Sequence, residues 1–568
     1  MGRWPRLSLI VALAMLAFMV SVLASGCGTS SETSGDPLDA ATGDTGTTPE
    51  SGTGATSDAG SGSSGDTDAT RNVPFDSAAP PEASEDAGAD GAHAPDATAC
   101  DPSGPPSQGA CAIDESLGVF VAPPSFGGSD ASSGTRTSPF ATIGHALANL
   151  GGKSRVYLCD GTFDERVTIS AGVNLYGGLA CPNANAGAPW SYVGGHASIV
   201  GPNREIALSI LSSPGPVLLE DIAISAPDGM GEDGYANGVS SIATLVNAST
   251  TVFRRCVLTA GNGDMGDSGV PAQIGSVGFS TLTAPDGGSS GAQTGGLPGT
   301  NYCGLTMPQG GTGGTASLPA PEPDGGTGTP LPAAPVAPKD GLGGRGDDGS
   351  SGCTNGDDGA DGLPGARGAA ATTLGTLTAT GWTPTWGSDG QPGGVGQGGG
   401  GGGAKVSPLL GGTGGGAGGC PGGGGAGGRG GGASIALASL DSTISLDACV
   451  LKTGHGGAGG AGGYGANGQG GGAPGATSQG CSGGWGGSGA GGSGGAGGTA
   501  GISVCIVSNG ATPMQTGDTS CTPGPAGVVG LHGSKGTGGA ASATRPGSDG
   551  NDGEDGLAGL SQATLSLP

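Results

Sequence analysis

Two pairs of adjacent aspartates could supply the two carboxyl groups that glycoside hydrolysis requires. They are Asp347-Asp348 and Asp357-Asp358. An inverting glycosidase uses one carboxyl group as general acid and the other as general base, and a rigid scaffold holds the two about 6.5–9.5 Å apart. Both pairs lie in a glycine-rich stretch in which no strand or helix pattern supplies such a scaffold. We therefore expect these aspartates to be solvated turn residues.

Two further sites contain side chains that could act on a polysaccharide. His455 stands between two glycines, which resembles an element of polygalacturonases, but the Asn-Thr-Asp, paired Asp and Arg-Ile-Lys segments of that family are absent at matching spacing. Arg254 and Arg255 form an adjacent basic pair on a predicted strand and could supply the base of a lyase, yet no aspartate cluster is aligned with them. We predict no catalytic residue.

Metal ligation has little support in the sequence. There is no CxxC pair and the five histidines are scattered, which argues against a zinc site. Calcium is the one metal that we keep as an alternative, because carboxylates on flexible turns suit a hard cation. Its candidate ligands are Asp549, Asp552, Glu554 and Asp555. The Gly-Gly-x-Gly-x-Asp repeat of calcium rolls is absent, so our prediction is that the protein has no cofactor.

The composition limits both the core and the partners. Glycine makes up 135 of 568 residues and aromatic residues only 3%, so only certain segments can bury enough apolar surface to fold. The formal net charge is −28. A chain this acidic is a poor partner for nucleic acid or for anionic lipid.

The first 27 residues are similar to a bacterial lipoprotein signal. Arg3 and Arg6 precede an apolar stretch over residues 7–22, and small residues then lead to Cys27. The resemblance implies that Cys27 is acylated and becomes the new N-terminus, anchored in a membrane. An uncleaved membrane-spanning anchor is the alternative, although an apolar run of about 17 residues is marginal for a span. Gly28 replaces the aspartate that retains enterobacterial lipoproteins at the inner membrane, which favours the outer membrane or the cell surface.

After the signal segment we expect a linker, then short strands and one helix. Residues 28–115 are acidic and rich in Ser, Thr, Gly and Asp, which predicts a disordered linker. Short alternating strands begin near residue 118. Apolar residues at helical spacing predict a helix with Thr137 or Ser138 as N-cap and Pro139 at its first position. These apolar residues are Phe140, Ile143, Ala146, Leu147 and Leu150.

Several blocks of residues in this region carry a family resemblance. They are Val119-Phe120-Val121, Gly128-Ser129-Asp130, residues 138–143, residues 156–163 and Leu175-Tyr176-Gly177-Gly178. They are similar to the N-terminal cap and first coil of right-handed parallel β-helix proteins, specifically the pectin-lyase-like, DUF1565-type lipoproteins of myxobacteria. The resemblance covers about residues 117–262. It implies an all-β solenoid in which a helix caps the open end of the first coil, and it says little about activity.

An internal repeat indicates that the solenoid continues after a long insertion. Residues 241–243 and 256–263 recur as 434–436 and 449–456, at a constant offset of 193. A constant offset over more than 20 residues indicates the same structural rung twice, and a shorter variant follows at 502–507. The predicted segments are a cap and coils over 116–263, an insertion over 264–431, a rung over 432–455, an insertion over 456–499, a rung over 500–530 and a tail over 531–568.

The insertions are rich in glycine, in places with a three-residue period. Gly343 to Gly352, Gly356 to Gly368 and Gly547 to Gly559 keep this period. A collagen triple helix needs more triplets and more proline than these runs contain. We expect either loops or extended glycine helices with three residues per turn, packed side by side where only hydrogen separates the backbones.

Twelve cysteines remain after Cys27, an even number in a compartment that permits disulfides. We expect structural bridges. Cys159 and Cys181 each follow a strand at about one rung's separation, which suggests a bridge between neighbouring coils. Cys100 and Cys111 suit a local loop before the cap.

Together these observations favour a membrane-anchored surface lipoprotein with a structural or adhesive role, in contact with extracellular polysaccharide or a surface protein. The alternative is a polysaccharide lyase or glycoside hydrolase. Charged residues aligned in a groove on consecutive rungs would favour the enzyme, whereas an uncharged or covered face would favour adhesion.

Overall fold

The computed structural model describes residues 100–181, 189–231, 236–272, 283–332, 337–476, 480–542 and 544–568. The signal segment with Cys27 and the predicted linker up to residue 99 lie outside these ranges. The described residues belong to one compact unit, His93–Pro568. None of the helices in the described ranges has the length and apolar character needed to cross a membrane.

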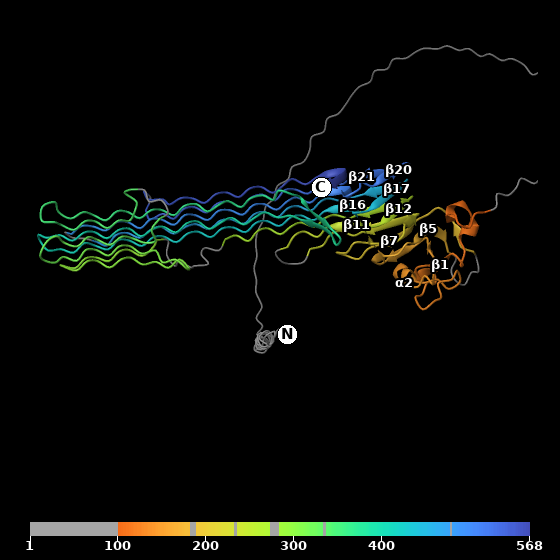
Figure 1. The fold of residues 1–568 in the computed structure, drawn as a ribbon, viewed down its shortest axis with the longest axis horizontal. Helices are drawn as coiled ribbons and strands as arrows, with labels where there is room; N and C mark the ends of the chain where they lie inside the picture. Colours follow the sequence, from red (N-terminus) through yellow and green to blue (C-terminus); the bar gives the residue numbers. More distant parts are fainter. Residues whose placement is uncertain are drawn as a thin grey trace, which may run out of the picture. The chain divides into compact units, whose positions relative to one another are not determined.

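The described chain is all-β and is built on three sheets in which the long strand ladders are parallel (Figure 1). The first sheet contains, in order, β1 (Gly118–Val121), β2 (Arg155–Cys159), β5 (Asn174–Ala180), β9 (Val217–Glu220), β12 (Thr250–Arg254), β17 (Thr443–Asp447) and β20 (Met514–Thr516), with β6 (Ser191–Tyr192) antiparallel to β5. The second contains β3 (Thr162–Asp164), β7 (Ala197–Val200), β10 (Ile222–Ala226), β13 (Val257–Ala260), β18 (Val450–Lys452) and β21 (Ser520–Thr522). The third contains β4 (Val167–Ile169), β8 (Leu208–Leu211), β11 (Ser241–Asn247), β16 (Ser434–Leu440), β19 (Ser503–Asn509) and β22 (Ser561–Leu567).

From β8 onward the chain visits the third, first and second sheets in rotation. The predicted equivalence at an offset of 193 is confirmed by the pairing. Ser241 lies opposite Ser434, Thr250 opposite Thr443 and Val257 opposite Val450. The 173 residues between β13 and β16 therefore leave the register of the sheets unchanged.

Apolar side chains stack in register to form the core between the sheets. One column on the first sheet runs Leu175, Leu219, Phe253 and Leu446, which pair in that order and are all fully buried. Burying one such side chain contributes about 1.5–3 kcal/mol. Because side chains alternate between the two faces of a strand, a one-residue slip would expose the whole column, so the hydrophobic pattern fixes the register.

The predicted helix exists but begins later than expected. Helix α2 spans Ile143–Ala148, and its N-cap is Thr142, whose side chain accepts a hydrogen bond from the His145 N–H. The prediction of Thr137 or Ser138 as N-cap was wrong. Phe140 is extended instead and exchanges backbone hydrogen bonds with the β1 edge, donating to Phe120 O and accepting from the Ala122 N–H. An open strand edge recruits these groups more strongly than one more helical turn would.

The predicted linker also ends earlier than residue 115. Residues 100–113 form the short 3-10 helices η1 (Pro106–Gln108) and η2 (Ala110–Ala112), and a third, η3 (Pro124–Phe126), follows β1. Arg155 donates to the backbone carbonyls of Ser103, Gly104 and Ala112, which ties this segment to the first sheet. Ile113 is 1% exposed. Tertiary hydrogen bonds and one apolar anchor therefore order a stretch whose composition predicts disorder.

Most of the described insertion residues form extended runs that pack side by side (Figure 1). We call these runs the glycine array: residues 261–272, 283–299, 310–316, 322–329, 341–347, 354–369, 386–404, 411–433, 454–476, 480–502, 523–542 and 544–560. The sequence analysis left two alternatives for the insertions, loops or extended glycine helices packed side by side. The structure shows the second. The array also carries a hairpin that the sequence analysis missed, β14 (Gly375–Thr378) with β15 (Gly381–Pro384). Its Leu377 and Trp382 pack against the apolar outer face of the third sheet.

The run 480–502 shows how the array is held together. Its N–H groups donate in three directions, each set at three-residue intervals and with N···O distances of 2.7–3.0 Å. Gly486 through Gly501 donate to residues 457–472, Gly484 through Ala496 to residues 388–400, and Gly491 through Ala500 to residues 548–557. Three directions at a three-residue period require three residues per turn, the geometry of the polyproline II helix. That helix has no internal hydrogen bonds, so neighbouring runs must supply the partners.

The close packing explains why glycine is required at one residue in three. A Cβ atom on Gly486, Gly489, Gly492, Gly495, Gly498 or Gly501 would lie 1.8–2.1 Å from a carbonyl oxygen of the run 411–433. The predicted tail belongs to the same structure, since its run to residue 560 packs in the array and β22 pairs with β19. The extended conformation expected for the glycine period over 343–352 continues only to Gly346, because Gly349 and Gly352 adopt positive φ in a turn.

Candidate functional site

Charged side chains line up on three adjacent strands of the first sheet. Glu220, Arg254 and Asp447 end β9, β12 and β17 and lie in register. The Arg254 guanidinium is 3.0 Å from Glu220 and 3.4 Å from Asp447. In the turns that follow, Arg255 lies 2.7 Å from Asp221 and 2.5 Å from Glu220. We call these five residues the ionic cluster.

Two of the three carboxylates of this cluster, Glu220 and Asp221, are buried and fully partnered, whereas Asp447 is 41% exposed. Glu220 and Asp221 are 1% and 3% exposed. Besides the two arginines, Glu220 accepts a hydrogen bond from the Ser107 hydroxyl at 2.9 Å and Asp221 one from the Tyr192 hydroxyl at 3.0 Å. These carboxylates raise the pKa of Arg255, and burial beside Asp221 raises the pKa of Tyr192. Every carboxylate oxygen of Glu220 and Asp221 therefore has a donor.

This pairing decides what the ionic cluster can do chemically. A lyase base must lose its proton, but the hydrogen bonds to Asp221 and Glu220 stabilise the protonated form of Arg255 and so raise its pKa. Arg254 and Arg255, the candidates from the sequence, are both held in ion pairs. The charges are aligned on consecutive strands, which is the pattern expected of an enzyme, but both arginines and the two buried carboxylates are held in ion pairs. The arrangement links neighbouring strands of the first sheet.

The aspartate pairs of the sequence analysis bind the backbone of the array rather than a substrate. Asp347 is 7% exposed and accepts hydrogen bonds from the Gly349 and Val406 N–H groups. Asp358 accepts one from the Trp485 N–H and pairs with Arg545 at 2.5 Å. The prediction of solvated turn residues was therefore wrong for these two. Asp348 does lie in a turn, where hydrogen bonds from Ser350 and Ser351 lower its pKa.

Sequence reasoning missed one carboxyl pair, Asp340 with Asp357. The pKa of Asp357 is raised by burial and by a hydrogen bond shared with Asp340. The residues stand 17 apart, with Asp340 just before the run 341–347 and Asp357 in the run 354–369, so no local motif indicated the contact. Two carboxyl groups in direct hydrogen-bond contact leave no room for the sugar and water that glycosidase carboxyls flank. The pair is therefore not arranged for glycoside hydrolysis.

Asn and Asp side chains of the array follow a regular pattern. Asn355, Asp358 and Asp361 accept hydrogen bonds from the N–H groups of Ser482, Trp485 and Ser488, at a constant offset of 127. A side-chain oxygen of the neighbouring run thus takes the place of a backbone carbonyl. Much of the acidic charge in the array satisfies backbone donors in this way.

The proposed calcium ligands belong to the same pattern. Asp549, Asp552 and Asp555 accept hydrogen bonds from the N–H groups of Gly538, Lys535 and His532, at 2.9–3.0 Å. These bonds lower the pKa of Asp549 and Asp555. Lys535 and His532 also pair with two of the carboxylates. Within the described ranges no group of three or more His, Cys, Asp or Glu side chains is placed to hold a metal ion.

His455 contributes its backbone to the packing of the array. Its N–H donates to Asn262 Oδ1 at 2.8 Å and its carbonyl accepts from the Gly263 N–H. The side chain itself is exposed. Asn262 and His455 stand at the repeat offset of 193, so this contact joins equivalent positions of the two rungs.

Five disulfides join described residues. Two are the pairs suggested by spacing, Cys100–Cys111 and Cys159–Cys181; the others are Cys303–Cys420, Cys353–Cys481 and Cys505–Cys521. The expected structural bridges therefore account for ten of the twelve cysteines, and Cys256 and Cys449 are buried thiols. These two precede the paired strands β13 and β18, in which Val257 pairs with Val450.

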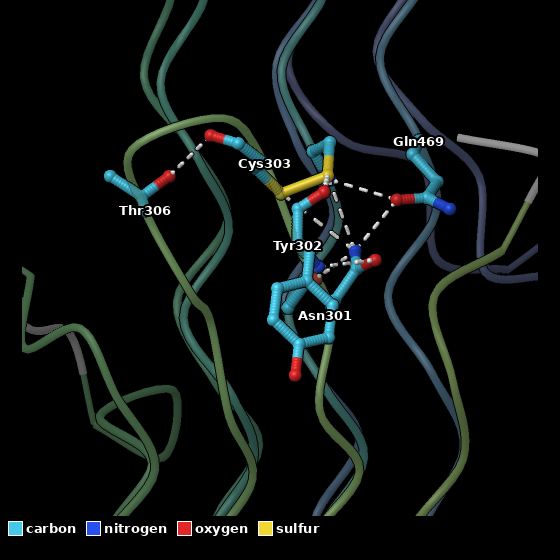
Figure 2. The surroundings of a disulfide bond; sticks show 7 residues. Asn301, Tyr302, Cys303, Thr306 and Gln469 are labelled. Atoms are coloured by element: carbon cyan, nitrogen blue, oxygen red, sulfur yellow. Dashed lines mark hydrogen bonds between the residues drawn. A yellow bond between two sulfur atoms is a disulfide. The ribbon is translucent and has the colours of Figure 1, made fainter. Parts of the chain in front are cut away.

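The Cys303–Cys420 bridge sits in a buried polar cluster of the array (Figure 2). The Asn301 side-chain amide donates to Gln469 Oε1 at 2.8 Å and to the Gly418 carbonyl at 2.9 Å. Asn301 and Gln469 are 7% and 1% exposed. A satisfied buried network of this kind fixes one arrangement of the runs, because any shift would leave polar groups unpaired.

Comparisons with protein families, with curated proteins and with solved structures find no match for this chain. The class is therefore defined by the molecule alone. It is an all-β protein with three parallel sheets that carries a hydrogen-bonded array of glycine-rich helices.

Proposed function

We propose that this protein is a lipid-anchored surface protein of a bacterial envelope with a structural or adhesive role. In this proposal the coils form a right-handed parallel β-helix that presents the glycine array as a rigid body to the surroundings. The observation that carries the proposal is the run 480–502, which is hydrogen-bonded to neighbours in three directions. A backbone held in this way is suited to keeping a shape and offers no chemistry of its own.

The β-helix part of the proposal rests on the rotation of the chain through three sheets. Successive coils pair strand by strand, as a parallel solenoid requires. Helix α2 packs against β1, β2 and β4, the first strands of the coil, where a cap would lie. Both features agree with the resemblance of residues 117–262 to pectin-lyase-like lipoproteins of myxobacteria.

The adhesive part rests on what the array exposes. Large apolar side chains of the array and its connecting loops are exposed and are available for contact with a partner. Examples are Leu297 (74% exposed), Tyr302 (67%), Leu305 (107%), Leu331 (71%) and Leu363 (69%). The bridges Cys303–Cys420 and Cys353–Cys481 hold the neighbouring runs, so partner binding needs little further ordering. Extracellular polysaccharide or a surface protein is the proposed partner.

The anchoring part rests on the segment that ends at Cys27. We expect Cys27→Ala to abolish labelling by radioactive palmitate and to leave unprocessed precursor, which mass spectrometry of the N-terminus would detect. An unmodified mature N-terminus elsewhere in the wild-type protein would refute the lipoprotein assignment.

A polysaccharide lyase or hydrolase is the second candidate, favoured only by the alignment of Glu220, Arg254 and Asp447. The purified protein should be tested in parallel for retention of polysaccharides and for release of unsaturated or reducing-end products. Retention without products supports the adhesive role. Products that disappear in an Arg254→Ala variant would establish the enzyme instead.

A further inference from the structure

A cavity of about 570 Å³ opens in the array between the runs 322–329 and 341–347 and the turn that follows them. Its polar lining includes Glu322, Asp324, Arg345 and Asp348, and the rings of Pro321 and Pro323 supply apolar surface. The volume falls within the range of about 300–1,000 Å³ that is typical of small-molecule sites.

The walls of the cavity are held rigidly. The turn is closed by Asp348, which accepts hydrogen bonds from the backbone and hydroxyl groups of Ser350 and Ser351. The next residues are tied to the run 480–502 by the Cys353–Cys481 bridge. Asp324 fixes the opposite wall through a hydrogen bond from the Gly346 N–H at 2.8 Å. A ligand would therefore meet a preformed site.

Several polar groups of the lining are not used by the fold. Glu322 is 3% exposed; one carboxylate oxygen accepts from the Ser317 N–H, and the other has no partner among the described residues. The second carboxylate oxygen of Asp324 and the Arg345 side chain also have no hydrogen bond or ion pair within the described ranges. The second oxygen of Asp324 and the Arg345 guanidinium belong to exposed residues and can bind a ligand directly. The unpartnered oxygen of Glu322 is itself buried, so Glu322 contributes negative charge to the lining.

The charge of the lining selects the ligand. Three carboxylates and one guanidinium give a formal charge of −2, which repels uronic acids and attracts a cation. Apolar proline rings beside carboxylate and guanidinium groups match a sugar ring, whose C–H groups can contact the prolines and whose hydroxyls can donate to Asp324 and accept from Arg345. We propose that this cavity binds a hexosamine with a free ammonium group, as a unit of an extracellular polysaccharide. The inference rests on the proposed adhesive function and names the substrate class for it.

The test uses the mature protein purified in detergent and titrated calorimetrically with glucosamine oligomers. Oligomers of N-acetylglucosamine, galacturonate and lysine, matched in length, serve as the other probes. We expect binding of the glucosamine oligomer alone. Asp324→Asn should weaken it at least tenfold, because it removes a charged hydrogen-bond acceptor. Glu322→Gln should weaken it as well, because it removes one of the three negative charges of the lining.

The matched control is Asp389→Asn, which lies outside the cavity. Asp389 accepts a backbone hydrogen bond from Gly427 at 2.8 Å, just as Asp324 does from Gly346. The control should bind like the wild type. Equal unfolding profiles of the Asp324→Asn and Asp389→Asn variants would show that lost binding is not lost folding.

Three results would overturn the inference: equal affinity in the Asp324→Asn and Asp389→Asn variants, preference for galacturonate, or oligolysine binding as tightly as the glucosamine oligomer. Retention of another polysaccharide together with any of these results would leave the adhesive function standing. Retention of no polysaccharide or surface protein at all would overturn the adhesive function as well.

Discussion

Gly495 offers a direct test of how the glycine array is packed. It lies in the run 480–502 and donates its N–H to Gly463 O at 3.0 Å. A Cβ atom on Gly495 would lie 2.1 Å from the Ala426 carbonyl oxygen. A carbon and an oxygen atom need about 3.3 Å, so Gly495→Ala would force the two runs apart by about 1.2 Å.

The expected cost follows from the hydrogen bonds beside this contact. Gly425 donates to Ser493 O at 3.0 Å and Gly428 donates to Ala496 O at 2.8 Å. A separation of more than 1 Å breaks both bonds, at about 1 kcal/mol each. Residual overpacking adds about 1 kcal/mol. We therefore expect Gly495→Ala to lower the local stability by about 3 kcal/mol.

Hydrogen exchange read by mass spectrometry on peptides covering residues 420–431 measures this local stability. A loss of about 3 kcal/mol corresponds to exchange about a hundred times faster. Gly144→Ala is the control, because a Cβ there would meet Glu165 Oε2 at an ordinary 3.4 Å. It should leave exchange in this peptide unchanged. Unchanged exchange in Gly495→Ala as well would refute the packing of these runs through glycine.

Three further changes test other parts of the structure. Glu220→Gln removes the buried charge that Arg254 contacts and should lower the free energy of unfolding in urea by about 2 kcal/mol. This loss is smaller than for a fully buried ion pair, because the Arg254 side chain is 35% exposed. Destabilisation no greater than in an exposed Asp441→Asn control would contradict this. Burial raises the pKa of the Glu165 carboxyl group, so the folded chain keeps this group protonated to higher pH than the unfolded chain does. The stabilisation from the protonated group is therefore complete below its ordinary pKa and is lost as the pH rises through the pKa of the folded state. Glu165→Gln should remove this loss from a pH series of urea midpoints, and an unchanged slope would argue against it. Replacing both Cys303 and Cys420 by serine removes a bridge with a sequence separation of 117. The chain-entropy treatment predicts that this lowers the free energy of unfolding by about 5 kcal/mol, which urea unfolding of the oxidised proteins would measure. A loss below about 1 kcal/mol would show that the array holds these runs without the bridge.

Local patterns in the sequence predicted those parts of the fold that depend on neighbouring residues. Alternating apolar residues identified strands, and the constant offset of 193 identified equivalent rungs, because the same side chains must fill the same core positions. The three-residue glycine period indicated packed helices as one of two outcomes. Cys159–Cys181 and Cys100–Cys111 could be suggested because their separations are short, 22 and 11 residues.

The remaining features depend on contacts between segments far apart in the chain. The helix starts at Ile143 because the β1 edge recruits Phe140. Asp358 and Asp347 are backbone acceptors because distant runs bring N–H groups to them.

The sequence by itself therefore determined the kinds of element and which strands are equivalent. It gave no means of choosing neighbours for runs that are nearly identical in composition. That choice depends on hydrogen bonds between runs and on bridges such as Cys303–Cys420 and Cys353–Cys481. The second of these bridges also holds a wall of the cavity. Only the tertiary structure decides it, because a polyproline II helix has no internal hydrogen bonds and its partners lie in other parts of the chain.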